Sequence, residues 1–492
     1  MIALGIDCGT QSTKTIAFDL DSRTVVAHAT RSYGLIEGLP PGHAEQDPAA
    51  WIEALEGTIL EVLDTLGARR RDVSAIGVSG QQHGFVPLDA NGAVIRPAKL
   101  WCDTSTTEEC ALFSANFGGS KGLIGRLGLD VLPGFTAPKI LWLKRHEPQN
   151  FARLATVLLP HDYLNFHLTG ETKMEYGDAS GTALVDIRSR QWEPEICAFI
   201  DPTLTDMLPP LESSRSANGW LRHDLAKKWN LPHDVVVSAG GGDNMMGAIG
   251  TGNVLPGRVT ASLGTSGTIF AYAEKPVVDP EGEIAAFCDS TDAWLPLLCT
   301  MNVTVATEAA RNLFGWSHSS AETAISSVAT GSDGLLFLPY LQGERTPNLP
   351  HARGSLHGIT LKNYTPAHIA RATMEGVTLG LAYGLERLRN LGISPTEIRL
   401  TGGGSKSSVW RTICADVFGV PIVTIANAEG AAFGAVIQAI AAVRPEKTVN
   451  EWAEDLVETL PDERVDPTPH HVAIYRDLRE SHTKLTGLLN NS

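Results

Sequence analysis

Two aspartates in glycine-rich segments are the residues of this chain that are best placed for chemistry. Asp7 and Asp243 lie far apart in the sequence, yet each follows a strand-like apolar run, Ile2–Ile6 and Val235–Ala239. The neighbouring glycines leave the backbone open to a ligand, and a carboxylate can hold a cation or accept a proton. The pair therefore predicts a phosphoryl-transfer site between two domains.

The segment around Asp7 has the pattern of a phosphate-binding hairpin, and a second copy occurs later in the chain. Residues 2–20 are typical of a strand, a tight loop of small and hydroxyl residues, and a second strand. Residues 260–272 repeat the pattern. Such loops can present backbone N–H groups to a phosphate. The expected phosphate contacts are Thr10 and Lys14 in the first copy and Gly264 and Thr265 in the second.

Other predicted strands also end in polar or glycine-rich loops, where open α/β sheets bind ligands. The strand 74–80 ends at Gln81-Gln82-His83, and the strand 397–401 ends at Gly402-Gly-Gly-Ser405, followed by a predicted helix over 409–417. Asp47 and Pro48 mark the start of an earlier helix, as N-cap and first-turn proline. These elements indicate an α/β fold with its ligands at the strand ends.

The length of 492 residues favours two domains, because a single core rarely grows beyond about 300 residues. We place the first domain at residues 1–245. The sequence between 202 and 234 shows no regular apolar pattern and is rich in Pro, Ser and charged residues, so the domain boundary is expected soon after it. The second α/β domain is expected at 254–444, starting with the repeated hairpin. Residues 445–492 are predicted to be a helical surface tail.

Charge and cysteine content exclude several classes of function. The net charge of −16 argues against nucleic-acid and anionic-membrane partners, so a phosphate must be met by local amides, a few cations or a metal ion. Seven cysteines without paired spacing predict reduced thiols in a cytoplasmic protein. The longest apolar stretches, such as Ala431–Val443, are too short to span a membrane.

Several long segments resemble those of the FGGY carbohydrate kinases, which share the actin-like, ribonuclease H-like fold of sugar kinases and heat-shock ATPases. The resemblance runs from Leu4 to Val443 and is carried by four segments: 134–146 (GFTAPKILWLKRH), 339–347 (PYLQGERTP), 354–359 (GSLHGI) and 368–375 (HIARATME). Ordered patterns of this length are more specific than a short glycine motif. The resemblance implies two actin-like domains flanking a cleft.

The resemblance also implies roles for the residues that bind ATP and Mg²⁺ and move the phosphoryl group. Asp243 corresponds to the family's general base and Asn244 to a residue that orients the sugar. Asp7 is suited to holding Mg²⁺ through water, and the Gly264-Thr265 loop to clasping the β- and γ-phosphates. The segment formed by Gly402, Gly403, Gly404 and Ser405 resembles the adenosine loop. The structural alternatives are a glycine turn for Asp243, a loop cap for Asp7, and a turn that requires positive φ for the later glycines.

The sugar site is expected at Gln82, His83 and Asp103, with a ketopentose, most closely D-xylulose, as the substrate that the resemblance implies. Family members that act on D-xylulose often have Gln-Met-His and Trp-Asn-Asp where this chain has Gln81-Gln82-His83 and Trp101-Cys102-Asp103. These departures keep ribulose or another ketose open. The absence of an Arg-Glu pair argues against glycerol. The lack of a cation beside Gln82 and His83 argues against gluconate, although a distant Lys or Arg could fold back to this strand end. A core histidine and a helix cap are the alternatives for His83 and Asp103.

A nucleotide-dependent sensor of the same fold is an alternative of another class, because fold alone does not fix function. The retained base Asp243 and the polar strand end at Gln82 and His83 favour an enzyme that closes on a small-molecule sugar. Relatives are often dimers, so a homodimer is expected as well.

Overall fold

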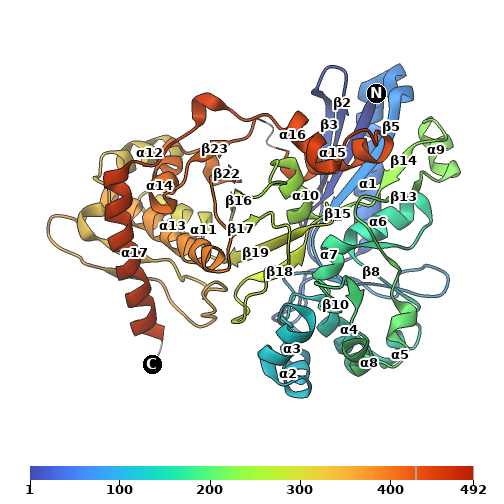
Figure 1. The fold of residues 1–492 in the computed structure, drawn as a ribbon, viewed down its shortest axis with the longest axis horizontal. Coiled ribbons are helices and arrows are strands. Elements are labelled where there is room, and N and C mark those ends of the chain that lie inside the picture. Colours follow the sequence, from blue (N-terminus) through green and yellow to red (C-terminus); the bar gives the residue numbers. More distant parts are fainter. Residues whose placement is uncertain (427–428, 491–492) are drawn as a thin grey trace. The chain divides into compact units, whose positions relative to one another are not determined.

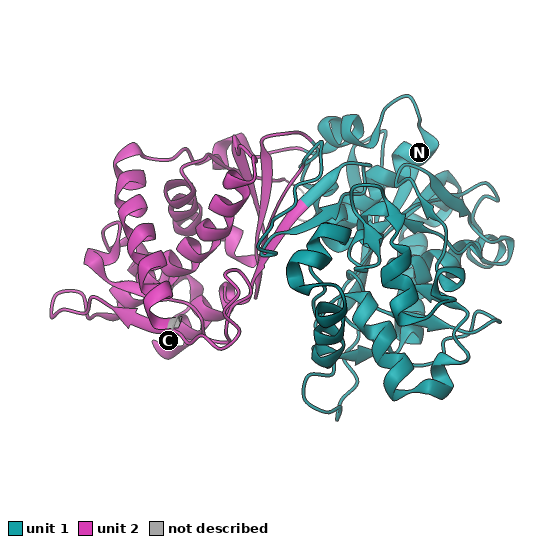
Figure 2. Ribbon diagram, turned by 60° about the horizontal axis from the view of Figure 1, so that its bottom comes forward, with its two compact units in different colours: residues 1–254, 273–295, 429–457 teal, residues 255–272, 296–428, 458–492 magenta. Residues whose placement is uncertain are grey.

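The computed structural model describes residues 1–426 and 429–490, which form two compact units (Figure 2). Unit 1 contains residues 1–254, 273–295 and 429–457, and unit 2 contains residues 255–272, 296–428 and 458–492. The units therefore differ from the division into 1–245, 254–444 and 445–492, because two later segments pack with the first domain. The reason is hydrophobic: the segment 429–457 supplies a helix that covers one face of the first sheet.

The central sheet of unit 1 has the strand order β13-β14-β5-β1-β2-β3. Figure 1 labels β2, β3, β5, β13 and β14 of this sheet. Residues of β1 alternate between two cores, since Leu4 and Ile6 face one cluster while Ala3 faces the other. Such a strand reads as continuously apolar because both faces of the sheet are covered. The strands are β1 (Ile2–Cys8), β2 (Ser12–Asp19), β3 (Thr24–Ser32), β5 (Val73–Gly80), β13 (Ala217–Trp220) and β14 (Val236–Ser238), with β15 (Gly241–Gly242) beside β5.

Helices cover both faces of this sheet. On one face α1 (Pro48–Leu66) buries Trp51 and Leu55, and it begins where Asp47 accepts the backbone N–H of Ala49, as the sequence predicts. On the other face lie α10 (Asp243–Gly250) and α15 (Gly430–Val443), which contact each other. The apolar stretch in α15 is therefore a buried helix of unit 1, which explains its composition.

The strands of unit 2 lie in the order β19-β17-β16-β22-β23. They are β16 (Arg258–Leu263), β17 (Gly267–Ala271), β22 (Glu397–Thr401), β23 (Ile422–Thr424) and β19 (Trp294–Thr300), which joins this unit at Pro296. The long helix α13 (Pro366–Asn390) packs against α14 (Ser408–Phe418) and α17 (Pro469–Asn490). The predicted helix over 409–417 thus corresponds to α14.

The predicted hairpin repeat is present in both units. In unit 1, β1 pairs antiparallel with β2 and parallel with β5; in unit 2, β16 pairs antiparallel with β17 and parallel with β22. Asp7 lies opposite Lys14 and Ser79, and its counterpart Ser262 lies opposite Thr268 and Thr401. Only the first copy therefore carries an acid at this position.

The remaining helices of unit 1 are α2 (Thr107–Asn116), α3 (Gly119–Leu127), α4 (Thr136–His146), α5 (Pro148–Phe151), α6 (Pro160–Thr169), α7 (Tyr176–Ser180), α8 (Pro194–Ile200), α9 (His223–Trp229) and α16 (Val449–Leu456). Its short strands are β4 (Glu45–Gln46), β6 (Val86–Leu88), β7 (Ala98–Lys99), β8 (Thr156–Leu158), β9 (Met174–Glu175), β10 (Val185–Asp186), β11 (Gln191–Trp192), β12 (Leu211–Glu212) and β18 (Ala285–Cys288). Unit 2 adds α11 (Thr304–Leu313), α12 (His318–Ser326), β20 (Leu336–Leu338) and β21 (Ser355–His357).

The cysteines, the apolar helices and the C-terminal segment can each be located in the structure. All seven cysteines are free thiols, four of them buried. Among the described residues, no helix combines the length and the apolar character that a bilayer crossing needs. The residues predicted as a surface tail are divided between the units: α16 packs in unit 1, and α17, whose Tyr475 and His482 are buried, packs in unit 2.

Candidate active site

Asp7 and Asp243 lie at the same end of the unit 1 sheet. Asp7 is next to Ser79 across β1 and β5, and Gly241 of β15 is next to Ser79 on the other side. Asp243 follows two residues later as the first residue of α10, with Gly242 as its N-cap. Both carboxylates are half-buried, so each keeps some surface for a ligand.

The electrostatics of this pair favour a proton acceptor beside a cation-binding group. Burial, together with the nearby negative charges of Asp7 and Asp178, raises the pKa of Asp243 from 3.8 to about 7. Burial also raises the pKa of Asp7, although a hydrogen bond from Ser79 Oγ (2.9 Å) and the charge of Lys14 oppose the rise. Two neighbouring carboxylates with little solvent would be stabilised by a cation.

Asn244 and Gln82 join Asp243 in one hydrogen-bonded group. Asn244 Nδ2 donates to Gln82 Oε1 (2.5 Å) and to Asp243 Oδ1 (3.0 Å), while its backbone N–H donates to the same Asp243 oxygen (2.8 Å). Gln82 Nε2 contacts Met245 Sδ at 3.1 Å. The structure therefore brings together the expected base and two of the expected sugar contacts.

His83 follows Gln82 with a left-handed backbone, at φ +44°. Its backbone N–H donates to Asp178 Oδ1 (3.1 Å), and its carbonyl accepts from Lys139 Nζ (2.9 Å) and Thr136 Oγ1 (3.0 Å). His83 is only 8% exposed, and its ring lies near Phe135 and Phe287, with ring centroids 5.2 and 5.5 Å away. His83 is thus a fixed side chain beside the Asp243 group.

The expected phosphate contacts of the first hairpin take part in other interactions in this structure. Thr10 Oγ1 donates to Gln81 Oε1 (3.2 Å) and accepts from Trp101 Nε1 (3.0 Å), so it links the hairpin to the strand end that carries Gln82. Lys14 Nζ forms an ion pair with Glu429 at 2.6 Å, and both side chains are about one-third exposed. Lys14 therefore remains accessible to an anion.

Asp103 is placed differently from the other sugar candidates. Its side chain is fully buried, and its oxygens accept from the Ala44 N–H, Lys99 Nζ and Ser105. Its sequence context gave no sign of the ammonium partner. In this structure Asp103 has no exposed surface for a sugar, and it does not cap α2, whose N-cap is Thr106.

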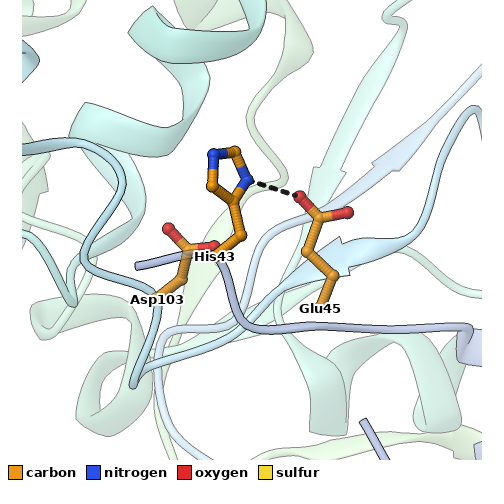
Figure 3. Close-up of side chains that lie close together, drawn as sticks. All are labelled: His43, Glu45 and Asp103. Atoms are coloured by element: carbon orange, nitrogen blue, oxygen red, sulfur yellow. Dashed lines mark ion pairs between the residues drawn. The ribbon is translucent and has the colours of Figure 1, made fainter. Parts of the chain in front are cut away.

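Asp103, His43 and Glu45 lie close enough together to resemble a metal site (Figure 3). Lys99 Nζ, however, lies 3.1 Å from both carboxylates and 3.3 Å from His43 Nδ1. An ammonium therefore already supplies the positive charge that this acidic cluster needs. We interpret the cluster as a structural ion-pair network.

In unit 2 the two predicted nucleotide loops are adjacent. Gly264 and Thr265 follow β16, Gly402–Ser405 follow β22, and these strands are parallel neighbours. A Cβ atom at Gly402 would lie 2.7 Å from the Leu263 carbonyl carbon, and Gly402 has φ +81°. Close approach and positive φ both require glycine here. Thr265, Gly402 and Gly403 are exposed.

Family models match both halves of the chain. The N-terminal domain model of the FGGY family of carbohydrate kinases matches residues 2–250, and the C-terminal domain model matches residues 259–443. The chain belongs to the FGGY family of carbohydrate kinases. It is therefore a sugar kinase, and the predicted α/β fold of the actin-like superfamily is confirmed for this FGGY member.

Individual relatives of this FGGY kinase cover nearly its full length. The xylulose kinase of Haemophilus influenzae is 40% identical over 89% of this chain and 90% of its own. The xylulose kinase of Escherichia coli is 36% identical over 98% of both chains. The solved xylulose kinase of Rhodospirillum rubrum is 29% identical, with a TM-score of 0.92 over 99% of each chain.

Sequence reasoning missed the buried charges around His83 in this FGGY kinase. Lys139 lies in the segment 134–146, which indicated the family but gave no role for the lysine. Asp178 lies in α7, and its Oδ2 is 3.1 Å from Nδ1 of His161. An Asp-Ala-Ser segment gives no local sign of such partners, since they come from three separate parts of the chain.

Proposed function

We propose that this kinase transfers the γ-phosphoryl group of ATP to D-xylulose, giving D-xylulose 5-phosphate and ADP. The observation that carries the proposal is the group formed by Asp243, Asn244 and Gln82, in which the carboxylate has a pKa of about 7. The full-length similarity to xylulose kinases supports the choice of sugar. Ribulose is the second candidate, because Gln82 and Cys102 stand where many kinases of D-xylulose have other residues.

Asp243 acts in this proposal as the general base. A base works best when its pKa is near the working pH, because it is then ionised yet still holds a proton well. As the sugar oxygen bonds to the γ-phosphorus, the bond between that phosphorus and the departing ADP oxygen breaks, and the hydroxyl proton moves to Asp243. Asn244 and the amide of Gln82 hold the carboxylate and the sugar in position.

Asp7 is the residue that we propose to hold Mg²⁺, through water. Its oxygen donors suit a hard cation, and the unfavourable closeness of Asp7 to Asp243 fits a site in which a positive charge is bound. The ion would neutralise phosphate oxygens. Thr10, Lys14, Gly264 and Thr265 are proposed phosphate contacts, and Gly402, Gly403, Gly404 and Ser405 are the proposed adenosine loop. Asp103 is proposed to fix the Trp101 loop rather than to contact the sugar itself.

The test is coupled ADP release with ATP and Mg²⁺, in the presence and absence of D-xylulose. We expect sugar-dependent turnover, and a kcat/KM for D-xylulose that exceeds those for ribulose, glycerol and gluconate. Slow hydrolysis that no sugar stimulates would instead identify a nucleotide-dependent sensor. A higher kcat/KM for ribulose than for D-xylulose would identify ribulose as the preferred substrate, and the reaction class would stay the same. Cytoplasmic location and a homodimer stay predictions, the second testable by sedimentation.

A further inference from the structure

The backbone of His83 has a left-handed conformation, which is uncommon for residues other than glycine. Only a few per cent of non-glycine residues occur at positive φ, with histidine among the more tolerant types, and His83 lies at φ +44°. Such residues gather at functional sites. The residues that stabilise this conformation can be identified from the hydrogen bonds of the two peptide groups on either side of the His83 Cα.

A buried charge of opposite sign contacts each of these two peptide groups. Asp178, fully buried, accepts the His83 N–H, and Lys139, also fully buried, donates to the His83 carbonyl. Lys139 Nζ also donates to the Gly134 carbonyl (2.7 Å), so its two acceptors are neutral carbonyls. Burial lowers the pKa of Lys139 to about 7. A buried ammonium is unfavourable for a core, so packing alone does not account for it.

The imidazole ring is fixed together with the backbone. Nδ1 lies 3.6 Å from Asp178 Oδ1, and a Cβ atom at residue 181 would lie 2.1 Å from the same nitrogen, so Gly181 is required for the ring to fit. Asp178 is fixed in turn by His161, whose Nδ1 lies 3.1 Å from Oδ2. The ring nitrogen that does not face Asp178 is Nε2.

We propose that Asp178 and Lys139 are positioning residues for sugar recognition: together they hold His83 in its left-handed conformation, so that Nε2 meets a sugar hydroxyl. This inference rests on the proposed function. A buried polar partner that is slightly misplaced leaves the hydroxyl without a hydrogen bond, which weakens sugar binding. Neither residue is among the proposed ATP contacts.

The first test compares Asp178→Asn and Lys139→Met with the wild type. We expect the KM for D-xylulose to rise at least tenfold, with kcat and the KM for ATP within about threefold. Thr136→Val, which removes an uncharged donor to the same carbonyl, gives a second variant if Lys139→Met does not fold. Asp416→Asn is the matched control, because Asp416 is a buried carboxylate that pairs with a histidine, His471, outside the group formed by His83, Asp178 and His161. Unchanged KM values in the first two variants would overturn the proposal.

A double-mutant cycle separates positioning from general stabilisation. In a His83→Asn background, where asparagine tolerates positive φ, Asp178→Asn should change the sugar KM less than threefold. An equal rise in both backgrounds would refute action through His83. Crystal structures of the two single variants provide a readout that needs no sugar: His83 should leave φ +44° or its ring should move. An unmoved His83 would overturn the proposal even if D-xylulose proved not to be the substrate.

Discussion

Replacing Asp243 with asparagine should abolish turnover and at the same time stabilise the folded protein above neutral pH. The carboxylate is partly desolvated and lies near two other acids, which raises its pKa from 3.8 to about 7. At about 1.4 kcal/mol for each pKa unit, this rise corresponds to about 4 kcal/mol of destabilisation once the group is ionised. Because the side chain keeps some exposed surface, water screens part of this, and we expect about 2 kcal/mol.

The sign of this effect depends on pH in a defined way. Below pH 3.8 the carboxyl is protonated in both the folded and unfolded states, so asparagine brings no advantage. Between pH 3.8 and 7 the folded wild type binds a proton at Asp243 that the unfolded chain has lost. The free energy of unfolding of the wild type, compared with that of the variant, therefore falls as the pH rises. Above pH 7 the difference reaches its full value.

The assay is urea unfolding of wild type and Asp243→Asn at pH 4.5, 6 and 8, with ADP release measured on the same samples. The variant should gain stability progressively over this range, and its kcat should fall at least a thousandfold while D-xylulose still binds. Asn244→Asp is a control with the opposite expected effect: it adds a negative charge beside Asp243 and should lower the free energy of unfolding at pH 8. A stability difference that is equal at all three pH values would refute the raised pKa, and near-normal turnover would refute the role as base.

Three further predictions concern other parts of the structure. The kcat of the wild type should rise with pH through an ionisation near 7, because Asp243 must be deprotonated to accept a proton; a rate independent of pH between 5.5 and 8 would contradict this. Gly402→Ala should lower Tm and raise the KM for ATP, because a Cβ would meet the Leu263 carbonyl at positive φ, whereas Gly403→Ala, with open space around it, should keep Tm unchanged. Equal Tm losses would show that the loop rearranges. Lys99→Met should destabilise by about 3–5 kcal/mol in urea unfolding, because Asp103 and Glu45 would lose their shared buried ammonium; a loss below about 1 kcal/mol would mean that water or Arg96 replaces it.

Local patterns in the sequence predicted those parts of the fold that local contacts determine. The two hairpins follow from strand alternation on either side of small-residue loops, and the start of α1 follows from the cap at Asp47. Asp7 and Asp243 lie at the same end of the unit 1 sheet because β1 and β15 both run parallel to β5, and the carboxyl ends of parallel strands share one edge. The grouping of Gln82 with Asn244 follows in the same way.

Features that depend on distant partners were not predictable from one sequence. Lys99 is only four residues from Asp103, but the burial of both side chains depends on the surrounding fold, so the sequence did not indicate a buried ion pair at this place. His83 is a common residue type in an uncommon backbone conformation, and the groups that hold it come from α4 and α7. The attachment of 429–457 to unit 1 depends on packing between α15 and strands more than 400 residues earlier, which periodicity does not encode.

That attachment has a consequence during synthesis. A nascent chain that has left the ribosome up to residue 400 contains every strand of the unit 1 sheet but not α15, so on that face Ile16, Phe18 and Ala75 lack the cover that α15 adds to α10. Such a chain should need a chaperone until translation is nearly finished. Splitting the gene between the two family-model regions should, for the same reason, give an insoluble first fragment, and adding the polypeptide 429–457 in trans should rescue it.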